Sequence, residues 1–213
     1  MMSFRQALLV SVLCAAAASV SADKKDKFIV GTRFNGDATV HLNRGGALLE
    51  KGDTPGARQS FEAAIRADPG IWPAYFNLAL ILAREEKWEL ALQTCNAAMR
   101  LRPGFFRTSI LRATINQKLG NDRASLVDLN TVISLHADDE TDAVALNQRA
   151  WLRILSPNDA IHNPAEALAD AGRACRLNYW KKAIYIDTLA AACAATGDFA
   201  GAVRNEEQAI KSG

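Results

Sequence analysis

A repeat of 34 residues is the feature that most constrains what this chain can fold into. Small or apolar residues recur in one register, which starts at Gly45, Ala57, Phe61, Ala64 and Pro69. One period later stand Ala79, Ala91, Cys95, Ala98 and Pro103, and the next period gives Ala113, Ser125, Leu129, Val132 and Ala137. Because three consecutive units keep this register, the pattern predicts a stack of copies of one supersecondary unit.

Two further units follow with a changed period. The fourth unit carries its small residues at Ala150, Ala167, Ala171 and Ala174, and the fifth has Ala190, Gly197, Phe199, Ala202 and Ala209. About five extra residues separate Ala150 from Ala167, and they fall in the segment 156–164, which is rich in helix-breaking residues. Asn163, Pro164 and Glu166 predict a capping box that restarts the helix after this insertion.

The small residues indicate two antiparallel helices that cross at close range. A large side chain at the crossing would separate the helices, whereas Gly or Ala lets them interlock. Gly52 and Gly120 are placed to end first helices, and Pro69 and Pro103 to end second helices. The pattern resembles the tetratricopeptide repeat, which has a small residue at position 8, Ala at 20, an aromatic residue at 24 and Pro at 32.

This resemblance implies an all-α fold, a right-handed α-solenoid of about five helix-turn-helix units with ten helices, over residues 38–213. The repeats are expected at about 38–71, 72–105, 106–139, 143–177 and 183–213, and repeat positions are counted from these starts. In the fourth unit the insertion shifts the second helix by five residues. The similarity is to the exported bacterial members of the family.

The first 22 residues predict a signal peptide. Arg5 provides a positive charge, residues 7–20 are an uncharged apolar run, and Val20, Ser21 and Ala22 give a plausible cleavage point. The run is short for a membrane span, so the mature chain is expected to have no transmembrane segment and to be periplasmic, in a Gram-negative cell, or secreted. A lipoprotein signal at Cys14 is the competing interpretation. Residues 23–37 are expected to be a flexible lead-in.

The composition excludes some classes of protein. Hydrophobic residues make up 49% and charged residues 23% of the chain, which is ordinary for a folded protein and excludes overall disorder. The formal net charge is +2, so the chain has no strong positive field for nucleic acid, and we expect no nucleic-acid partner.

No catalytic or cofactor motif is present in the sequence. It lacks a phosphate-binding loop, a dinucleotide glycine motif and metal-ligand spacing, so we expect no enzyme activity, no cofactor and no metal. His41, His136 and His162 each have a structural explanation. Cys95, Cys175 and Cys193 are interpreted as buried side chains, and a Cys175–Cys193 disulfide is the alternative.

Two departures from the repeat pattern predict surface features. Arg occupies position 7 in three units, as Arg44, Arg112 and Arg149, where we expect the stem to pack on a neighbouring helix and the charge to lie in solvent. Position 24 of the fifth unit is Glu206, in a run of polar residues, which predicts a terminal cap of the array.

In the resembled family, the first helix of each unit lines a concave face that binds partners. The residues that fall on it here are called the predicted binding positions: Phe76, Asn77, Leu80, Arg84, Arg107, Ile110, Thr114, Gln117, Lys118, Asn147, Gln148 and Trp151. Aromatic anchors, amides and cations together suit an extended or helical peptide. Packing of Phe76 or Trp151 between helices is the alternative. The sequence thus predicts a non-catalytic adaptor that binds another protein or peptide, with a self-associating or envelope-bracing structural protein as the alternative function.

Overall fold

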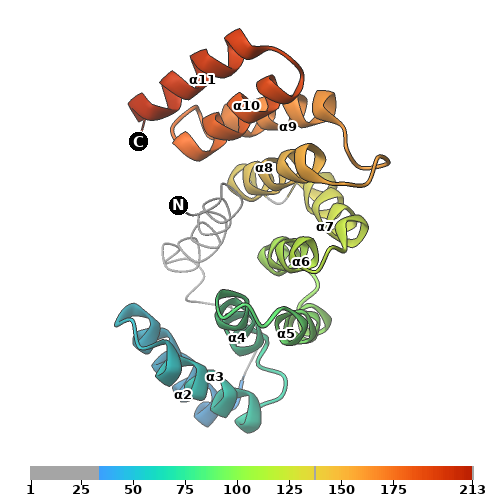
Figure 1. Ribbon diagram of the computed structural model, residues 1–213. Helices are drawn as coiled ribbons and strands as arrows, with labels where there is room; N and C mark the ends of the chain where they lie inside the picture. The colour runs from blue at the N-terminus through green and yellow to red at the C-terminus, as the bar shows by residue number, and fades with distance from the viewer. Residues whose placement is uncertain (1–33, 137, 213) are drawn as a thin grey trace. The chain divides into compact units, whose positions relative to one another are not determined.

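The computed structural model describes residues 34–136 and 138–212, which form ten helices and no strand (Figure 1). The expected all-α fold of about five helix pairs is confirmed. The expected signal peptide and residues 23–33 of the lead-in lie outside the described residues. The helices are α2 (Gly36–Glu50), α3 (Thr54–Ala67), α4 (Trp72–Arg84), α5 (Trp88–Leu101), α6 (Phe106–Lys118), α7 (Asp122–Leu135), α8 (Asp139–Leu155), α9 (Pro164–Leu177), α10 (Ala183–Ala195) and α11 (Phe199–Ser212).

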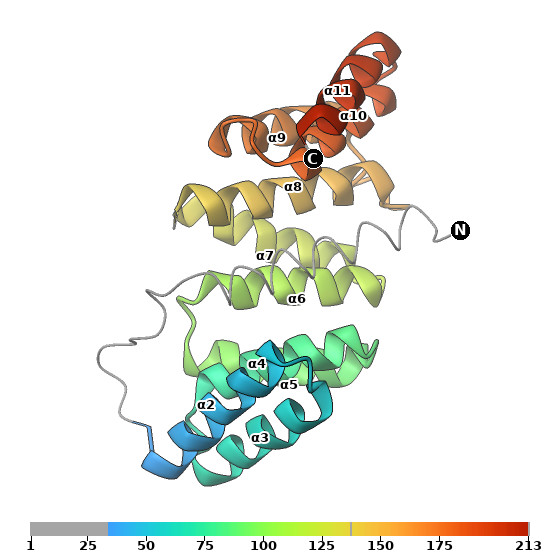
Figure 2. The same ribbon diagram turned by 90° about the vertical axis from the view of Figure 1, so that its left-hand side faces the viewer.

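The chain divides within α6 into two compact units, the first ending at Ile115 and the second beginning at Asn116. In the first unit α2 packs on α3, α3 on α4 and α4 on α5. In the second unit α7 packs on α8, α8 on α9, α9 on α10 and α10 on α11. The paired helices lie side by side in both views (Figure 2).

The small residues lie at helix crossings, as the repeat predicted. Position 8 is buried in all five units, at Gly45, Ala79, Ala113, Ala150 and Ala190. Positions 20, 24 and 27 are fully buried in each of the first four units, and Phe61, at position 24 of the first, has 0% exposure. A Cβ atom added to Gly45 would lie 2.5 Å from Cε1 of Phe61, which shows how closely α2 approaches α3.

Glycines end three of the first helices. Gly52, Gly120 and Gly197 have φ values of +81°, +75° and +85°, a backbone conformation that glycine adopts without a steric penalty. The same repeat position in the second unit is Glu86, which adopts a positive φ of 58°. The α3 and α5 helices stop at Ala67 and Leu101, two residues before Pro69 and Pro103, as expected.

Two helices begin earlier than the repeat boundaries indicated. The α2 helix starts at Gly36, where the side chain of Asn35 accepts a hydrogen bond from the backbone N–H of Asp37 at 2.9 Å. The α8 helix starts at Asp139, because the carboxylate of Asp138 accepts from the N–H of Thr141 at 2.7 Å. Side-chain caps thus accompany two additional residues in α2 and four in α8 that the repeat pattern does not encode.

The predicted capping box is only half formed. The side chain of Asn163 accepts from the backbone N–H of Glu166 at 3.1 Å, as expected. However, the backbone N–H of Asn163 donates to the carbonyl of Arg153 at 3.0 Å. The Glu166 carboxylate pairs with the Arg153 side chain instead of returning to Asn163. The backbone carbonyl of Arg153 thus binds the N–H of Asn163, and the guanidinium of Arg153 binds the Glu166 carboxylate. These two groups would otherwise have bonded to each other to complete the box.

The expected polar cap of the array is incomplete. Glu206 is exposed, as expected for a cap. However, α11 also exposes Phe199 (71%), Val203 (59%) and Ile210 (74%). These three residues recur every four to seven positions, so they lie along one side of the helix. One side of α11 therefore carries an exposed apolar stripe, although Arg204, Glu207 and Lys211 are exposed on the same helix.

Candidate functional site

The predicted binding positions come from both units, and each unit is considered by itself. The first unit supplies Phe76, Asn77, Leu80 and Arg84 from α4 and Arg107, Ile110 and Thr114 from α6. The second supplies Gln117 and Lys118 from the end of α6 and Asn147, Gln148 and Trp151 from α8. Seven of the twelve are buried: Phe76, Leu80, Ile110, Thr114, Asn147, Gln148 and Trp151.

Phe76 belongs to an aromatic cluster between α4 and the turn before α6. Its ring meets that of Phe105 edge-on, with centroids 5.1 Å apart, and the rings of Phe105 and Trp72 are 4.6 Å apart. The guanidinium of Arg102 lies 6.0 Å from the centre of the Trp72 ring. Phe76 is 2% exposed, so it serves packing between repeats, which is the alternative that the sequence left open.

Trp151 has the same role in the second unit. Its indole N–H donates to Oγ1 of Thr188, on α10, at 2.7 Å, and both residues are buried. One turn earlier, Oδ1 of the buried Asn147 has no hydrogen-bond partner among the described residues. Trp151 thus ties α8 to α10, and its polar end is used within the chain.

Two polar residues of α4 remain accessible beside the buried Phe76 and Leu80. Asn77 is half-buried and donates from Nδ2 to the carbonyl of Pro73 in its own helix at 2.9 Å. Arg84 is exposed and makes no hydrogen bond or ion pair with the described residues. The two are seven residues apart, so they lie on the same side of α4, two turns apart. This side of α4 presents an amide and a cation on a rigid apolar base.

The helix α6 contributes a less open surface. Ile110 and Thr114 are 4% and 5% exposed, and Oγ1 of Thr114 donates to the carbonyl of Ile110 at 3.2 Å. Arg107 is half-buried near the start of the helix. In the second unit, Lys118 is exposed at the end of the helix and Gln117 is half-buried. The cations are therefore the accessible members of the predicted set on this helix, because the side-chain nitrogen of Gln117 is buried.

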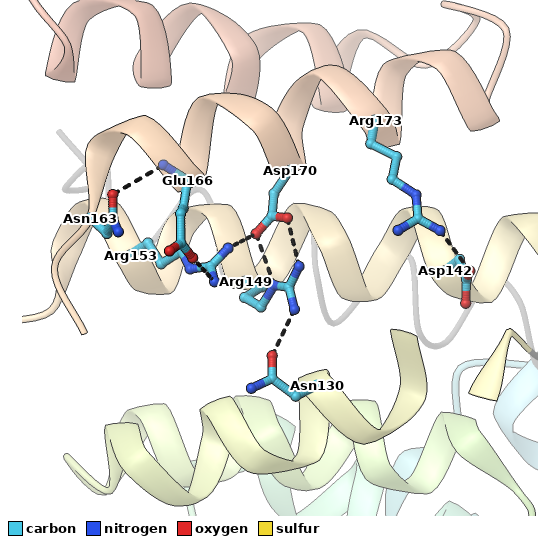
Figure 3. A network of polar contacts seen from close by, with 8 residues as sticks. All are labelled: Asn130, Asp142, Arg149, Arg153, Asn163, Glu166, Asp170 and Arg173. Atoms are coloured by element: carbon cyan, nitrogen blue, oxygen red, sulfur yellow. Dashed lines mark hydrogen bonds and ion pairs between the residues drawn. The ribbon is translucent and has the colours of Figure 1, made fainter. Parts of the chain in front are cut away.

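A charge network between α8 and α9 was not predicted (Figure 3). Asp170, whose side chain is 7% exposed, accepts two hydrogen bonds from Arg149, at 2.8 and 2.7 Å, and a third from Arg153. Arg149 also donates to Oδ1 of Asn130 on α7 at 2.7 Å. The side chain of Arg149 is 16% exposed, so the expectation that its charge lies in solvent is wrong. A recessed carboxylate across the helix pair draws the guanidinium inward.

The sequence does contain a signal for this network. Arg149 and Arg153 are four residues apart, as are Glu166 and Asp170, so each pair lies on one helix face. Two facing pairs of opposite charge on adjacent helices predict ion pairs between the helices. The five-residue insertion between α8 and α9 shifts the second pair out of the 34-residue register, so the repeat alignment did not place the two pairs opposite each other.

A second pair lies between the end of α7 and the start of α8. His136 has a left-handed backbone (φ 46°), and its Nδ1 is 2.8 Å from Oδ2 of Asp142, whose side chain is 5% exposed. Arg173 of α9 approaches the same carboxylate at 3.6 Å (Figure 3). His136 thus anchors the α7–α8 turn, and a structural explanation accounts for it.

The three cysteines of the described residues are buried and free, so the alternative of a Cys175–Cys193 disulfide is not what the structure shows. Burial raises the pKa of the Cys175 thiol to about 11, and it also raises the pKa of Cys193. A thiol with a raised pKa is a poor nucleophile, because the thiolate is the reactive form. These cysteines are therefore packing residues.

In the described part of the chain, no group of three or more His, Cys, Asp or Glu residues is arranged to hold a metal ion. Within residues 34–136 and 138–212, every helix is too short or too polar to cross a membrane.

Comparisons with known proteins agree with this fold. A tetratricopeptide-repeat family model matches residues 42–104. No curated protein matches the chain at a significant level. Among solved structures, MamA (from residue 41) of Desulfovibrio magneticus RS-1 has a TM-score of 0.70 at 16% identity, over 84% of this chain and 97% of that one. PilF of Pseudomonas aeruginosa has a TM-score of 0.71 at 15% identity, over 83% of this chain and 77% of that one.

A third similar structure is YrrB, described as a tetratricopeptide-repeat protein with an unusual peptide-binding site. Its TM-score is 0.60 at 16% identity, over 93% of this chain and 92% of that one. At these identities the likeness shows the fold alone. The tetratricopeptide-repeat family pattern is thus recognised over residues 42–104 of the chain, and its helical-repeat fold is shared with these structures over most of its length.

Proposed function

We propose that this protein is a non-catalytic adaptor that binds a partner protein or peptide on the first helices of its repeats. The observation that carries the proposal is the side of α4 that presents Asn77 and Arg84. Arg84 is exposed and has no partner within the described chain, and buried Phe76 and Leu80 hold its helix rigidly. A pre-positioned amide and cation on a rigid base bind a peptide without a large ordering cost.

Fold relatives support the same class of function. Proteins with tetratricopeptide repeats act as protein-interaction scaffolds, and YrrB is described as having a peptide-binding site. A helix surface with an accessible amide and an unpaired guanidinium favours a partner segment that carries carboxylates or exposed backbone carbonyls. The partner we propose is therefore a peptide segment with acidic residues.

The test is affinity capture with crosslinking of the tagged full chain in the producing cell. Arg84→Glu reverses the charge of an exposed residue, so the fold is expected to be unchanged while the partner is lost. Arg66→Glu makes the same charge change at an exposed residue of α3, away from the predicted binding positions, and should keep the partner. Phe76→Ala is unsuitable as a probe because it opens a cavity between repeats.

Circular dichroism melting of each variant separates a lost contact from a lost fold. A partner that is captured equally by the wild type, Arg84→Glu and Arg66→Glu would show that α4 is not the binding surface. Capture of no other protein by the wild type would contradict the adaptor function itself.

We also propose that the protein is exported to the periplasm or secreted after cleavage near Ala22. The proposal rests on the sequence pattern of residues 1–22. The measurement is cell fractionation followed by N-terminal sequencing. A mature chain that begins at Asp23 supports export, and a cytoplasmic chain that begins at Met1 contradicts it.

A further inference from the structure

One face of each first helix is covered by the preceding repeat. Positions 3 and 10 of the second to fifth units are 0–4% exposed: Ala74 and Ile81, Thr108 and Ile115, Ala145 and Leu152, and Tyr185 and Ala192. The carbonyl of Thr108 accepts a hydrogen bond from Sγ of Cys95, on the preceding α5 helix, at 3.4 Å. Positions 3, 7 and 10 therefore form the surface through which each repeat joins the one before it.

The same polar contact occurs twice at this joint. Arg112, at position 7, donates to Oδ1 of Asn96, at position 25 of the preceding repeat, at 2.9 Å. Arg149, at position 7 of the fourth unit, donates to Oδ1 of Asn130, at position 25 of the third, at 2.7 Å. An arginine at position 7 and an acceptor at position 25 thus link consecutive repeats at two of the four joints.

The first repeat has this joining surface but no described repeat to cover it. Val40, at position 3, is 65% exposed, and Ala47, at position 10, is exposed too. Arg44, at position 7, is exposed and makes no hydrogen bond or ion pair with the described residues. Lys51, one turn beyond Ala47, is also exposed. The uncovered surface of α2 therefore exposes Val40 and Ala47, with the cations Arg44 and Lys51 and the acids Asp37 and Glu50.

The last repeat has the complementary surface. Ile210, at position 28, is 74% exposed, whereas Ile133 at the same position of the third unit is 6% exposed. Phe199 and Val203 continue the apolar surface of α11. Glu207 occupies position 25, where Asn96 and Asn130 accept from an arginine, and like Glu206 it is exposed. Within the described residues Glu207 makes no hydrogen bond or ion pair.

We propose that the uncovered surface of α11 binds the α2 helix of a second copy of this chain, head to tail. Arg44 of one copy then pairs with Glu207 of the next, which repeats the contacts of Arg112 and Arg149 with a charged acceptor. Val40 packs against the apolar side chains of α11. The opposite charges of Arg44 and Glu207 favour this occupant, because they stand at positions 7 and 25, the two positions that link Arg112 to Asn96 and Arg149 to Asn130.

This contact is heterologous, so each copy offers one surface and receives the other, and association continues beyond a dimer unless a ring closes. It uses residues of α2 and α11, none of which belongs to the predicted binding positions. Self-association and partner binding are therefore independent, and the failure of one leaves the other untouched.

The test is the weight-average mass of the full chain by sedimentation equilibrium over a range of concentrations. The wild type is expected to gain mass with concentration. Arg44→Glu and Glu207→Arg each place like charges together and should each weaken association about tenfold, an effect that shrinks at high salt. The double variant Arg44→Glu/Glu207→Arg restores opposite charges and should recover association, and so should an equimolar mixture of the two single variants.

Matched controls make the same charge changes elsewhere. Arg66→Glu, on the exposed end of α3, and Asp159→Arg, in the exposed α8–α9 loop, should associate like the wild type. Ile210→Glu tests the apolar part and should abolish association, with no loss of thermal stability because the side chain is exposed. A wild type that stays monomeric at all concentrations overturns the proposal. So does a double variant that associates no better than the single variants.

Discussion

Gly45 and Gly46 are neighbours in α2 that should respond in opposite ways to one added methyl group. A Cβ at Gly45 would lie 2.5 Å from the ring of Phe61, which is fully buried. A Cβ at Gly46 would meet nothing within 4 Å. The small residue of the repeat pattern is thus required by contact at one position, while its neighbour has no such constraint.

We predict that Gly45→Ala lowers the free energy of unfolding by about 1–2 kcal/mol. Overpacking costs roughly 1–3 kcal/mol, and the loss of a helical glycine returns up to about 1 kcal/mol. Gly46→Ala causes no overpacking and replaces glycine with a better helix former, so it should raise the free energy of unfolding by about 0.5–1 kcal/mol. Urea unfolding monitored by circular dichroism measures both. Equal effects of the two substitutions would contradict the close approach of α2 and α3.

At the scale of the element, a pair of helices is held by more than its apolar crossing. The α8–α9 pair is held by close packing at Ala150 and Ala167 and also by the charge network around Asp170. Because the loop between these two helices is five residues longer than in the other repeats, it constrains their relative position less than a short turn would. Ion pairs between Arg149, Arg153 and Asp170 supply a directional contact across the gap (Figure 3).

We predict that Asp170→Ala destabilises the fold by about 3 kcal/mol, because two recessed guanidinium groups lose a shared carboxylate. Glu166→Gln is the matched control on the same helix: its side chain is 56% exposed, so the change should cost under about 1 kcal/mol. Thermal unfolding of the two variants gives the comparison. A cost for Asp170→Ala no larger than that for Glu166→Gln would show that the network adds no net stability.

At the scale of the whole molecule, the chain consists of two compact units, and stability in repeat proteins is set by each repeat and its nearest neighbours. Substitutions at one helix pair therefore act locally. This differs from a globular domain, in which a single core makes unfolding cooperative.

We predict that Gly45→Ala accelerates amide hydrogen exchange in α2 and α3 and leaves the exchange of α10 and α11 unchanged. The physical reason is that opening of the first repeat breaks contacts only with its neighbour. Hydrogen exchange followed by mass spectrometry resolves the helices by peptide. Equal acceleration in all ten described helices would instead indicate one cooperative unit.

The sequence by itself determined the fold class and the helix crossings. A 34-residue register records the contact that every repeat shares, so Ala57, Ala91 and Ala98 could be placed at crossings from spacing alone. Gly52 and Gly120 were predictable for the same reason, since a left-handed turn at a fixed point of the repeat favours glycine, although Glu86 adopts it in the second unit.

The tertiary structure decided which side chains are used within the chain. Spacing assigned Phe76 and Trp151 to a binding face, but Phe105 and Thr188, which lie in other elements, bury them. Arg44, Arg112 and Arg149 share a repeat position, yet Arg44 is exposed while the other two bind acceptors on the preceding repeat. A residue's environment depends on the neighbour that its helix meets, and a periodic pattern does not record where that neighbour is missing or changed.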